Sequence, residues 1–356
     1  MSDRNPSTAL VFSGGGARGA YQAGIALGLA ELHPPGRTRF RIMTGASAGA
    51  INAAYLAQRA DSFRDGAREL AEVWTGLSTA KVFRSDAWSL FVQGMRVLRS
   101  LLGGGMVAGK RQNHLLDTRP LDALIRNGID FRRIAGHIDG GQLGALAITT
   151  THYLTGSSVT HFATGDPVRE WDKSNHISLR AELSADHVLA SAAIPVFFAP
   201  IQVGGSYHGD GSVRLASPLR PAIHLGAEKI LAVSVRNLPP GASVRERNLA
   251  RASTISLAEI AGIMLNAVFL DSMDLDLERM ERINRTLSLL SEEQLALQRD
   301  PLRPIPVKLL RPSRDLGGMA TRHLDRLPRT LRYLLRGLGA KRGRPSDILS
   351  YLAFES

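Results

Sequence analysis

The stretch Arg41-Ile-Met-Thr-Gly-Ala-Ser-Ala-Gly-Ala-Ile-Asn52 decides the fold. Apolar residues alternate at its start, which predicts a short strand, and the alanine-rich residues 48–57 predict a helix. Between them lies a G-x-S-x-G pattern, and a serine on a sharp strand-to-helix turn is a nucleophile elbow. The turn is strained, so a side chain at Gly45 or Gly49 would collide with neighbouring backbone. We therefore expect Ser47 to stand above the sheet edge, where the N-terminus of the helix would stabilise an anion.

A glycine-rich loop precedes this elbow. Residues 9–12 predict a buried strand, residues 20–32 predict a helix, and the segment Ser13-Gly-Gly-Gly-Ala-Arg-Gly19 joins them. Consecutive glycines allow backbone N–H groups to converge on one point, which is typical of an oxyanion hole. Arg18 would either line that pocket or brace the loop, and bracing is the interpretation we favour.

The same loop has a rival interpretation as a dinucleotide-binding site, because Gly14, Gly16 and Gly19 satisfy G-x-G-x-x-G. That fingerprint requires an acidic residue near the end of the second strand, where it contacts the ribose hydroxyl. Here the second strand contains Arg39 and Arg41 and ends in the serine elbow. The missing carboxylate favours the oxyanion hole.

Composition is that of a globular protein. The 356 residues are 44% hydrophobic, enough for one large domain or two ordinary ones, and the absence of cysteine excludes disulfides and thiolate metal sites. We expect no signal peptide in the polar residues 1–8, and the longest apolar run, residues 260–270, is too short to span a bilayer. These features predict a cytoplasmic protein, with peripheral membrane contact as an addition.

The chain is strongly basic. Its formal net charge is +12 and its pI is about 10.6, values that favour nucleic acid or an anionic membrane surface as partner. No nucleic-acid motif accompanies the charge, so we expect no nucleic acid and keep a basic binding module as the alternative of a different class. Residues 311–356 predict a basic amphipathic segment, which suits an anionic membrane or a helix packed on the body with its arginines in solvent. The arginines at helical spacing are Arg322, Arg326, Arg329, Arg332 and Arg336.

Several other segments allow two interpretations. Residues 76–117 predict short helices that form either a lid-like insertion or ordinary packing. Residues 254–290 predict one long helix, whose acidic face we expect to be solvated rather than bound to a metal. Ser191 lies among small residues and is assigned to close packing, and Asp210 lies in an Asp-Gly pair that is usually only a turn. The acidic face consists of Asp271, Asp274, Asp276 and Glu278, paired with Arg279 and Arg282.

The sequence resembles the patatin-like phospholipases, because three motifs occur in the same order as in that family. They are the glycine loop of residues 14–19, the elbow of residues 45–49, and Asp210-Gly211. The resemblance covers most of the chain, and the ending, residues 349–354, is similar to bacterial members. It implies an α/β fold of three layers, α/β/α, around a mixed central sheet with the elbow after an early strand. The catalytic domain would be residues 9–310, with residues 1–8 as a flexible N-terminus.

Carried over by motif, the resemblance implies a serine–aspartate dyad in place of a Ser-His-Asp triad. Ser47 is then the nucleophile and Asp210 the proton acceptor, with the backbone N–H groups around Gly15 and Gly16 as the oxyanion hole. The family commonly has glycine or alanine where Ser212 stands, and we expect the turn to survive because serine is small. The remaining site residues implied are Gly14, Arg18 and Gly19 in the loop, Gly45, Ala46, Ala48 and Gly49 in the elbow, and Gly211 and Ser212 after the acid.

The implied activity is hydrolysis of fatty-acyl esters of a lipid or phospholipid, of the phospholipase A or lysophospholipase type, through an acyl-enzyme and without metal or cofactor. Asp210 would need partial burial to raise its pKa toward working pH, because a carboxylate is a weaker base than imidazole. A small-ester or thioester hydrolase without a membrane role is the second interpretation. A triad with a late histidine, His224 or His323, is a further alternative.

Overall fold

The strand–turn–helix predicted around Ser47 is present as β2 (Phe40–Ala46) and α2 (Ala48–Ala57). This computed structural model describes residues 7–32, 34–84, 114–237, 257–269, 271–296 and 302–322, with the single positions 327, 329, 332, 333, 351 and 354. Most of residues 76–117 and 311–356, on which the lid and membrane interpretations depend, lie outside the described residues. No helix in the described part of the chain has the length and apolarity needed to cross a bilayer.

Ten strands in the described residues form one mixed sheet, in the order β10-β9-β1-β2-β3-β4-β6-β5, and a β7–β8 hairpin joins it through β3. Strands β10, β9, β1, β2 and β3 run parallel, whereas β4 and β8 are antiparallel to β3. The mixed sheet predicted from the sequence is therefore confirmed. The strands are β1 (Thr8–Phe12), β2, β3 (Ala145–His152), β4 (Ser158–Thr164), β5 (Asp172–Lys173), β6 (His176–Arg180), β7 (Ile201–Val203), β8 (Ser206–Asp210), β9 (Lys229–Val233) and β10 (Val307–Leu310).

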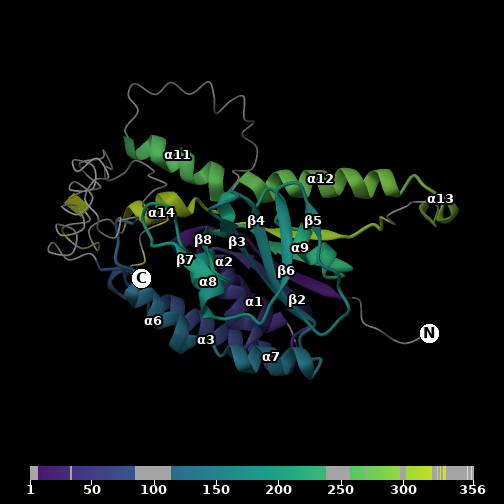
Figure 1. The fold of residues 1–356 in the computed structure, drawn as a ribbon, viewed down its shortest axis with the longest axis horizontal. Coiled ribbons are helices and arrows are strands. Elements are labelled where there is room, and N and C mark those ends of the chain that lie inside the picture. The colour runs from purple at the N-terminus through teal and green to yellow at the C-terminus, as the bar shows by residue number, and fades with distance from the viewer. Residues whose placement is uncertain are drawn as a thin grey trace.

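Helices cover both faces of the sheet, as Figure 1 shows, so the three-layer architecture is also confirmed. Along β1, Leu10 and Phe12 pack into the core beneath α1, α2 and α3, whereas Ala9 and Val11 pack into the core beneath α9 and α12. The helices are α1 (Gly19–Leu32), α2, α3 (Phe63–Thr75), α4 (Thr79–Val82), α6 (Arg119–Gly128), α7 (Phe131–Asp139), α8 (Ala185–Ser191), α9 (Arg220–His224), α11 (Leu257–Phe269), α12 (Asp271–Leu287), α13 (Glu292–Ala296) and α14 (Leu316–Arg322), with short 3-10 turns η1 (Gly16–Arg18) and η2 (Gly211–Val213).

Two boundaries differ from the sequence prediction. Strand β1 begins at Thr8, and the carbonyl of Ser7 already accepts the N–H of Glu228 at 2.8 Å, so order starts before residue 9. Residues 254–290 contain two helices, α11 and α12, rather than one.

The acidic face predicted to be solvated is partly buried, and that expectation was wrong. Asp274 is buried and pairs with Arg236 at 2.9 Å and with Arg311 at 2.6 Å, not with Arg279 or Arg282. Asp276 is buried as well, because α12 packs this side against the sheet. These contacts fasten α12 to the segments that follow β9 and β10.

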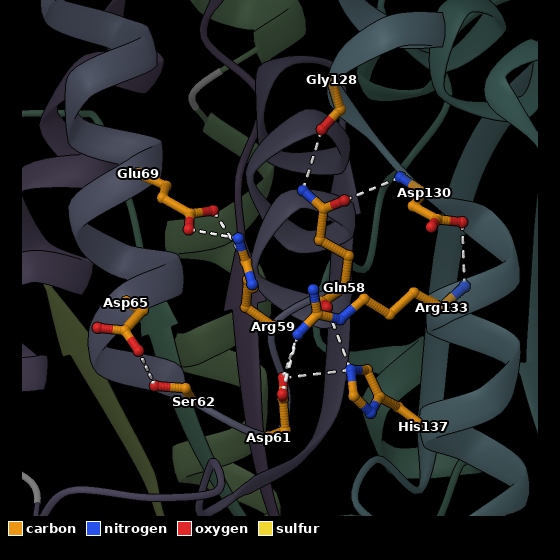
Figure 2. A network of polar contacts seen from close by, with 10 residues as sticks. All are labelled: Gln58, Arg59, Asp61, Ser62, Asp65, Glu69, Gly128, Asp130, Arg133 and His137. Carbon is orange, nitrogen blue, oxygen red and sulfur yellow. Dashed lines mark hydrogen bonds and ion pairs between the residues drawn. The ribbon is translucent and has the colours of Figure 1, made fainter.

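Figure 2 shows the polar contacts at the C-terminal end of α2, next to α6 and α7. The amide of Gln58 donates to the carbonyl of Gly128 at 3.0 Å and accepts the N–H of Asp130 at 2.8 Å. Arg133 donates to Asp61 at 2.9 Å. Exposed ion pairs of this kind contribute little, so the half-buried amide bonds of Gln58 fix α2 between α6 and α7.

A buried polar network fixes the other end of α2, next to the glycine loop. Asn52 donates to the side chain of Gln22 at 2.8 Å and accepts the indole N–H of Trp74 at 2.7 Å. Gln22 in turn donates to the carbonyl of Ser13 at 2.7 Å. The network joins α1, α2, α3 and the start of the loop through groups that burial would otherwise leave unsatisfied.

We expect Asn52→Ala to lower the free energy of unfolding by about 2 kcal/mol or more, because it leaves the buried partners on Trp74 and Gln22 unsatisfied. Urea denaturation measures this change. The exposed Asn127→Ala on α6 is the matched control and should change stability by no more than about 0.5 kcal/mol. Equal effects of the two substitutions would contradict the network.

Candidate active site

Ser47 sits in a strained backbone conformation between β2 and α2, with φ 56° and ψ −131°. A Cβ at Gly45 would lie 2.2 Å from the carbonyl oxygen of Gly49, and one at Gly49 would lie 2.6 Å from the carbonyl of Phe12. The collisions predicted for these two glycines are therefore confirmed. Such strain costs roughly 1–3 kcal/mol and persists only where the surroundings enforce it. Ser47 is only 2% exposed, so it is enclosed rather than raised into solvent.

Ser191 holds the elbow from the side. Its hydroxyl accepts the N–H of Ser47 at 3.0 Å and donates to the carbonyl of Thr149 at 2.6 Å. Ser191 is fully buried, as its assignment to packing requires, but sequence reasoning missed this positioning role. The contact spans 144 positions in sequence, and the only local signal was its place among small residues.

The glycine loop lies directly against the elbow. A Cβ at Gly14 would lie 3.2 Å from Cβ of Ser47, so the loop passes within contact distance of this serine. Gly16 has φ 56°, a conformation that favours glycine. Among the described residues, the N–H groups of Gly14, Gly15 and Gly16 have no hydrogen-bond acceptor. Backbone N–H groups that lack an acceptor and lie beside a serine are suited to donate hydrogen bonds to an oxyanion.

Arg18 is buried, and its guanidinium lies 4.6 Å from the centre of the Tyr351 ring. Tyr351 also lies against Gly16, where an added Cβ would come within 2.6 Å of its carbonyl oxygen. The hydroxyl of Tyr351 donates to Asn266 of α11 at 2.9 Å. Arg18 thus connects the loop to the C-terminal region, an arrangement that fits bracing. Gly19, next in the chain, packs on Trp74 and Ala48.

Asp210, at the end of β8, is held by its backbone beside this loop. Its N–H donates to the carbonyl of Ala193 at 2.9 Å, and its carbonyl accepts the hydroxyl of Thr151 at 2.7 Å. The carboxylate Oδ1 accepts the N–H of Ser212 at 2.9 Å. At Gly211 a Cβ would lie 1.9 Å from the carbonyl of Thr149, so only glycine fits this turn. The carboxyl therefore has one fixed orientation.

Burial raises the pKa of Asp210 to about 7, against weaker opposing effects of the Ser47 hydroxyl and of the Ser212 N–H and hydroxyl. The residue is fully buried. Its Oδ2 makes no hydrogen bond of ordinary geometry to a described residue, although the Ser47 hydroxyl is near enough to favour the charged form. A carboxylate with this pKa and one free oxygen is suited to accept a proton near neutral pH.

Ser212 turns its hydroxyl toward the same point. A Cβ at Gly14 would lie 2.0 Å from Oγ of Ser212, which is buried and makes no hydrogen bond of ordinary geometry to a described residue. The turn after Asp210 accommodates serine, as expected. Ser47, Gly14, Asp210 and Ser212 are thus brought together from three segments of the chain.

A narrow apolar cavity of about 50 Å³ borders Ser47. It is far smaller than an ordinary ligand pocket of roughly 300–1,000 Å³, so a long acyl chain requires its walls to part. Apart from Ser47, its lining consists of Gly16, Ala48, Ile51, Val73, Trp74, Leu77, Val82, Leu121, Leu124, Ala192, Ile194, Phe198 and Phe354.

The histidines considered for a triad do not adjoin Ser47 in the described part of the chain. His224 stacks on Trp171 in the opposite layer and lines a different cavity, so it cannot serve as the base. His323 lies outside the described residues. His208 bonds Thr150 at 2.9 Å, and burial lowers its pKa to about 4, which leaves it uncharged at neutral pH.

We expect Gly14→Ala to destabilise the protein by roughly 1–3 kcal/mol, because its new methyl group would overlap Oγ of Ser212. In a Ser212→Ala background the nearest atoms are at 3.1 and 3.2 Å, so the same substitution should cost less. Urea unfolding of the two single variants and the double variant measures this coupling. If the stability losses of the two single variants add up to that of the double variant, the Ser212 hydroxyl does not face Gly14.

The family model of the patatin-like phospholipases matches residues 10–223. Among solved structures, VipD from Legionella pneumophila shares 12% identity over 99% of this chain and 66% of that chain, with a TM-score of 0.33. The type III effector protein ExoU of Pseudomonas aeruginosa shares 17% identity over 98% of this chain and 77% of that chain, with a TM-score of 0.30. A search of curated proteins gave no match.

The family model covers more than half of the chain and includes the glycine loop, the elbow and Asp210. It supports hydrolysis of lipid acyl esters as the general activity. With this match, the chain belongs to the patatin-like phospholipase family.

Proposed function

We propose that this protein is a serine lipid acyl hydrolase of the phospholipase A or lysophospholipase type, with Ser47 as nucleophile and Asp210 as proton acceptor. One observation carries the proposal: a strained serine, a buried carboxyl with a pKa near 7 and an apolar cavity meet at one point. The unbonded N–H groups of the glycine loop lie beside them. Family membership supplies the substrate class, an acyl lipid.

In the first step, Oγ of Ser47 forms a bond to the ester carbonyl carbon while its proton passes to Asp210. The carbonyl oxygen becomes an oxyanion, which the N–H groups of Gly14, Gly15 and Gly16 receive. Loss of one such donor costs about 2.7–4 kcal/mol in a comparable enzyme. The tetrahedral intermediate then expels the alcohol, which takes the proton from Asp210 and leaves the acyl group on Ser47.

In the second step, Asp210 accepts a proton from water as the water oxygen attacks the acyl carbon. The same donors hold the second oxyanion. Collapse breaks the bond to Oγ, Ser47 regains its proton from Asp210, and the fatty acid leaves. Asp210 acts as base and then as acid in each half, which suits a pKa near the working pH.

The two ends of the segment proposed as a lid, residues 76–117, lie close to the cavity at Ser47. Leu77 and Val82 line the cavity, and the N–H of Arg84 donates to the carbonyl of Asp117 at 2.9 Å. Leu121 and Leu124 line the same cavity, so residues before and after the segment 85–113, which lies outside the described residues, both border it. This arrangement supports our proposal that residues 76–117 form a lid-like insertion next to the site. The small cavity equally favours the second candidate, an esterase for short acyl groups.

Hydrolysis of p-nitrophenyl esters should fall at least about 10³-fold in Ser47→Ala and in Asp210→Asn, because each removes one member of a unit that acts together. The exposed Asp166→Ala is the control and should retain wild-type activity. A series of acyl chains from two to ten carbons separates the two candidates. Activity that survives in Asp210→Asn would rule out the proposed base.

The pH dependence of hydrolysis should follow the ionisation of the buried carboxyl of Asp210. Asp210 accepts a proton only when ionised, so kcat/KM should rise with pH along one ionisation near 7. The free energy of unfolding should instead fall as the pH rises. The folded state holds a proton that the unfolded chain has lost above pH 3.8, so the stabilisation is full below 3.8 and is lost as pH rises through about 7.

Steady-state kinetics and urea unfolding from pH 4 to 9 measure both trends. Asp210→Asn should lack this stability change and should exceed the wild type in stability at pH 8. If kcat/KM instead rises with a midpoint near pH 4, burial does not raise the pKa of Asp210.

A further inference from the structure

A second cavity, about 500 Å³ in volume, lies on the opposite side of the sheet from α2. Figure 1 shows the elements that form it, β5, β6, α9 and α12, grouped together. It is ten times larger than the cavity at Ser47. The lining consists of Lys173, Ser174, Asn175 and His176 from the β5–β6 hairpin, Arg214, Ala216 and Ser217 after η2, Arg220 and His224 of α9, and Arg279 of α12.

The lining holds four cationic side chains and no carboxylate. Within the described residues, none of these four cations has a carboxylate oxygen within 4.0 Å; they are Lys173, Arg214, Arg220 and Arg279. Arg214 uses its Nε to donate to the carbonyl of Gly156 at 2.8 Å. That contact orients the guanidinium and leaves its two terminal nitrogens for a ligand.

The nearby carboxyl of Asp276 does not line the cavity. Its Oδ2 accepts the N–H of Leu219 at 2.9 Å, and burial raises its pKa in spite of Arg279 and Arg220. The surplus of positive charge also acts on His176. Burial, and then Arg220 and His224, lower the pKa of His176 to about 4. The cavity is therefore a region of positive potential that favours an anion.

We propose that this second cavity binds a phosphate-bearing anion. Guanidinium groups match phosphate oxygens with paired hydrogen bonds, and a lysine adds a compact charge. The arginines come from two helices and a loop, so a ligand in the cavity would contact guanidinium groups from three elements. Asn175 and Ser217 also line the cavity and can provide neutral donors. Two phosphates, as in a diphosphate, would satisfy the four cations better than one.

The cavity lies at the sheet end that carries the candidate active site. Arg214 follows Asp210 by four residues in sequence, and His176 pairs with Ser158, which pairs with Thr151 beside β8. The ligand is thus either a soluble phosphate compound or the phosphate of a lipid headgroup. The inference is independent of the proposed hydrolysis, since neither Ser47 nor Asp210 takes part in it.

The direct test is binding of inorganic pyrophosphate to the full chain, measured by calorimetry at low ionic strength. Lys173→Glu and Arg279→Glu should each raise the Kd about tenfold or more, because each replaces a charge-assisted contact by repulsion. Both positions are exposed, and unfolding curves check that each variant is folded. Arg285→Glu is the matched control: it is exposed on the same helix, does not line the cavity, and should change the Kd less than about twofold.

Vesicles distinguish the two sources of phosphate. Phosphatidylcholine vesicles with and without phosphatidic acid are sedimented with the wild type and the same variants. Binding that requires phosphatidic acid, is displaced by pyrophosphate and is lost in Lys173→Glu and Arg279→Glu assigns the site to a headgroup. Pyrophosphate binding without this pattern assigns it to a soluble compound. The proposal is overturned if the wild type does not bind pyrophosphate, or if Arg285→Glu weakens binding as much as the cavity variants.

Discussion

The whole site depends on how closely three backbone segments approach one another at the elbow. Gly49 packs beneath the carbonyls of Phe12 and Ser13, and Gly45 packs beneath the carbonyl of Gly49. Only a hydrogen atom fits at either Cα, so β1, β2 and α2 meet at one point. This contact brings the glycine loop after β1 to the serine after β2. It also enforces the backbone conformation that Ser47 would not adopt on its own.

Burial then determines what the site can do. The exclusion of water that raises the pKa of Asp210 also encloses Ser47 under apolar side chains. A carboxylate in contact with water would be too weak a base. An apolar cavity open to water would be unfavourable, because it would leave apolar surface exposed. The same enclosure therefore gives the carboxyl of Asp210 a pKa suited to accepting a proton and restricts the access of a ligand to Ser47. The oxyanion donors that we propose are backbone groups, so their position does not depend on the side chains around them.

Sequence patterns predicted the local elements of this site well. The β1–loop–α1 unit and the elbow consist of contiguous residues whose spacing reports their structure. The pattern missed α7, although Asp130 caps it by accepting two backbone N–H groups, and it missed β5, whose two residues form a strand only by pairing with β6.

Long-range contacts were beyond local patterns. Ser191 gains its role from Ser47, 144 positions away. Asp274 looks like a solvated helix residue until Arg236 and Arg311 are placed beside it. The four cations of the second cavity come from segments that span more than a hundred residues, so no stretch of sequence shows them as a group.

The order of the strands has a consequence for synthesis. Strand β1 lies inside the sheet only because β9 pairs with it from Lys229 to Val233, and β9 in turn pairs with β10. Both strands follow residue 223, where the family match ends. While the chain emerges from the ribosome, the strand that leads into the glycine loop is therefore an open edge for more than two hundred residues. During that interval its backbone groups are available to any other strand, so the nascent chain is exposed to mispairing until β9 arrives.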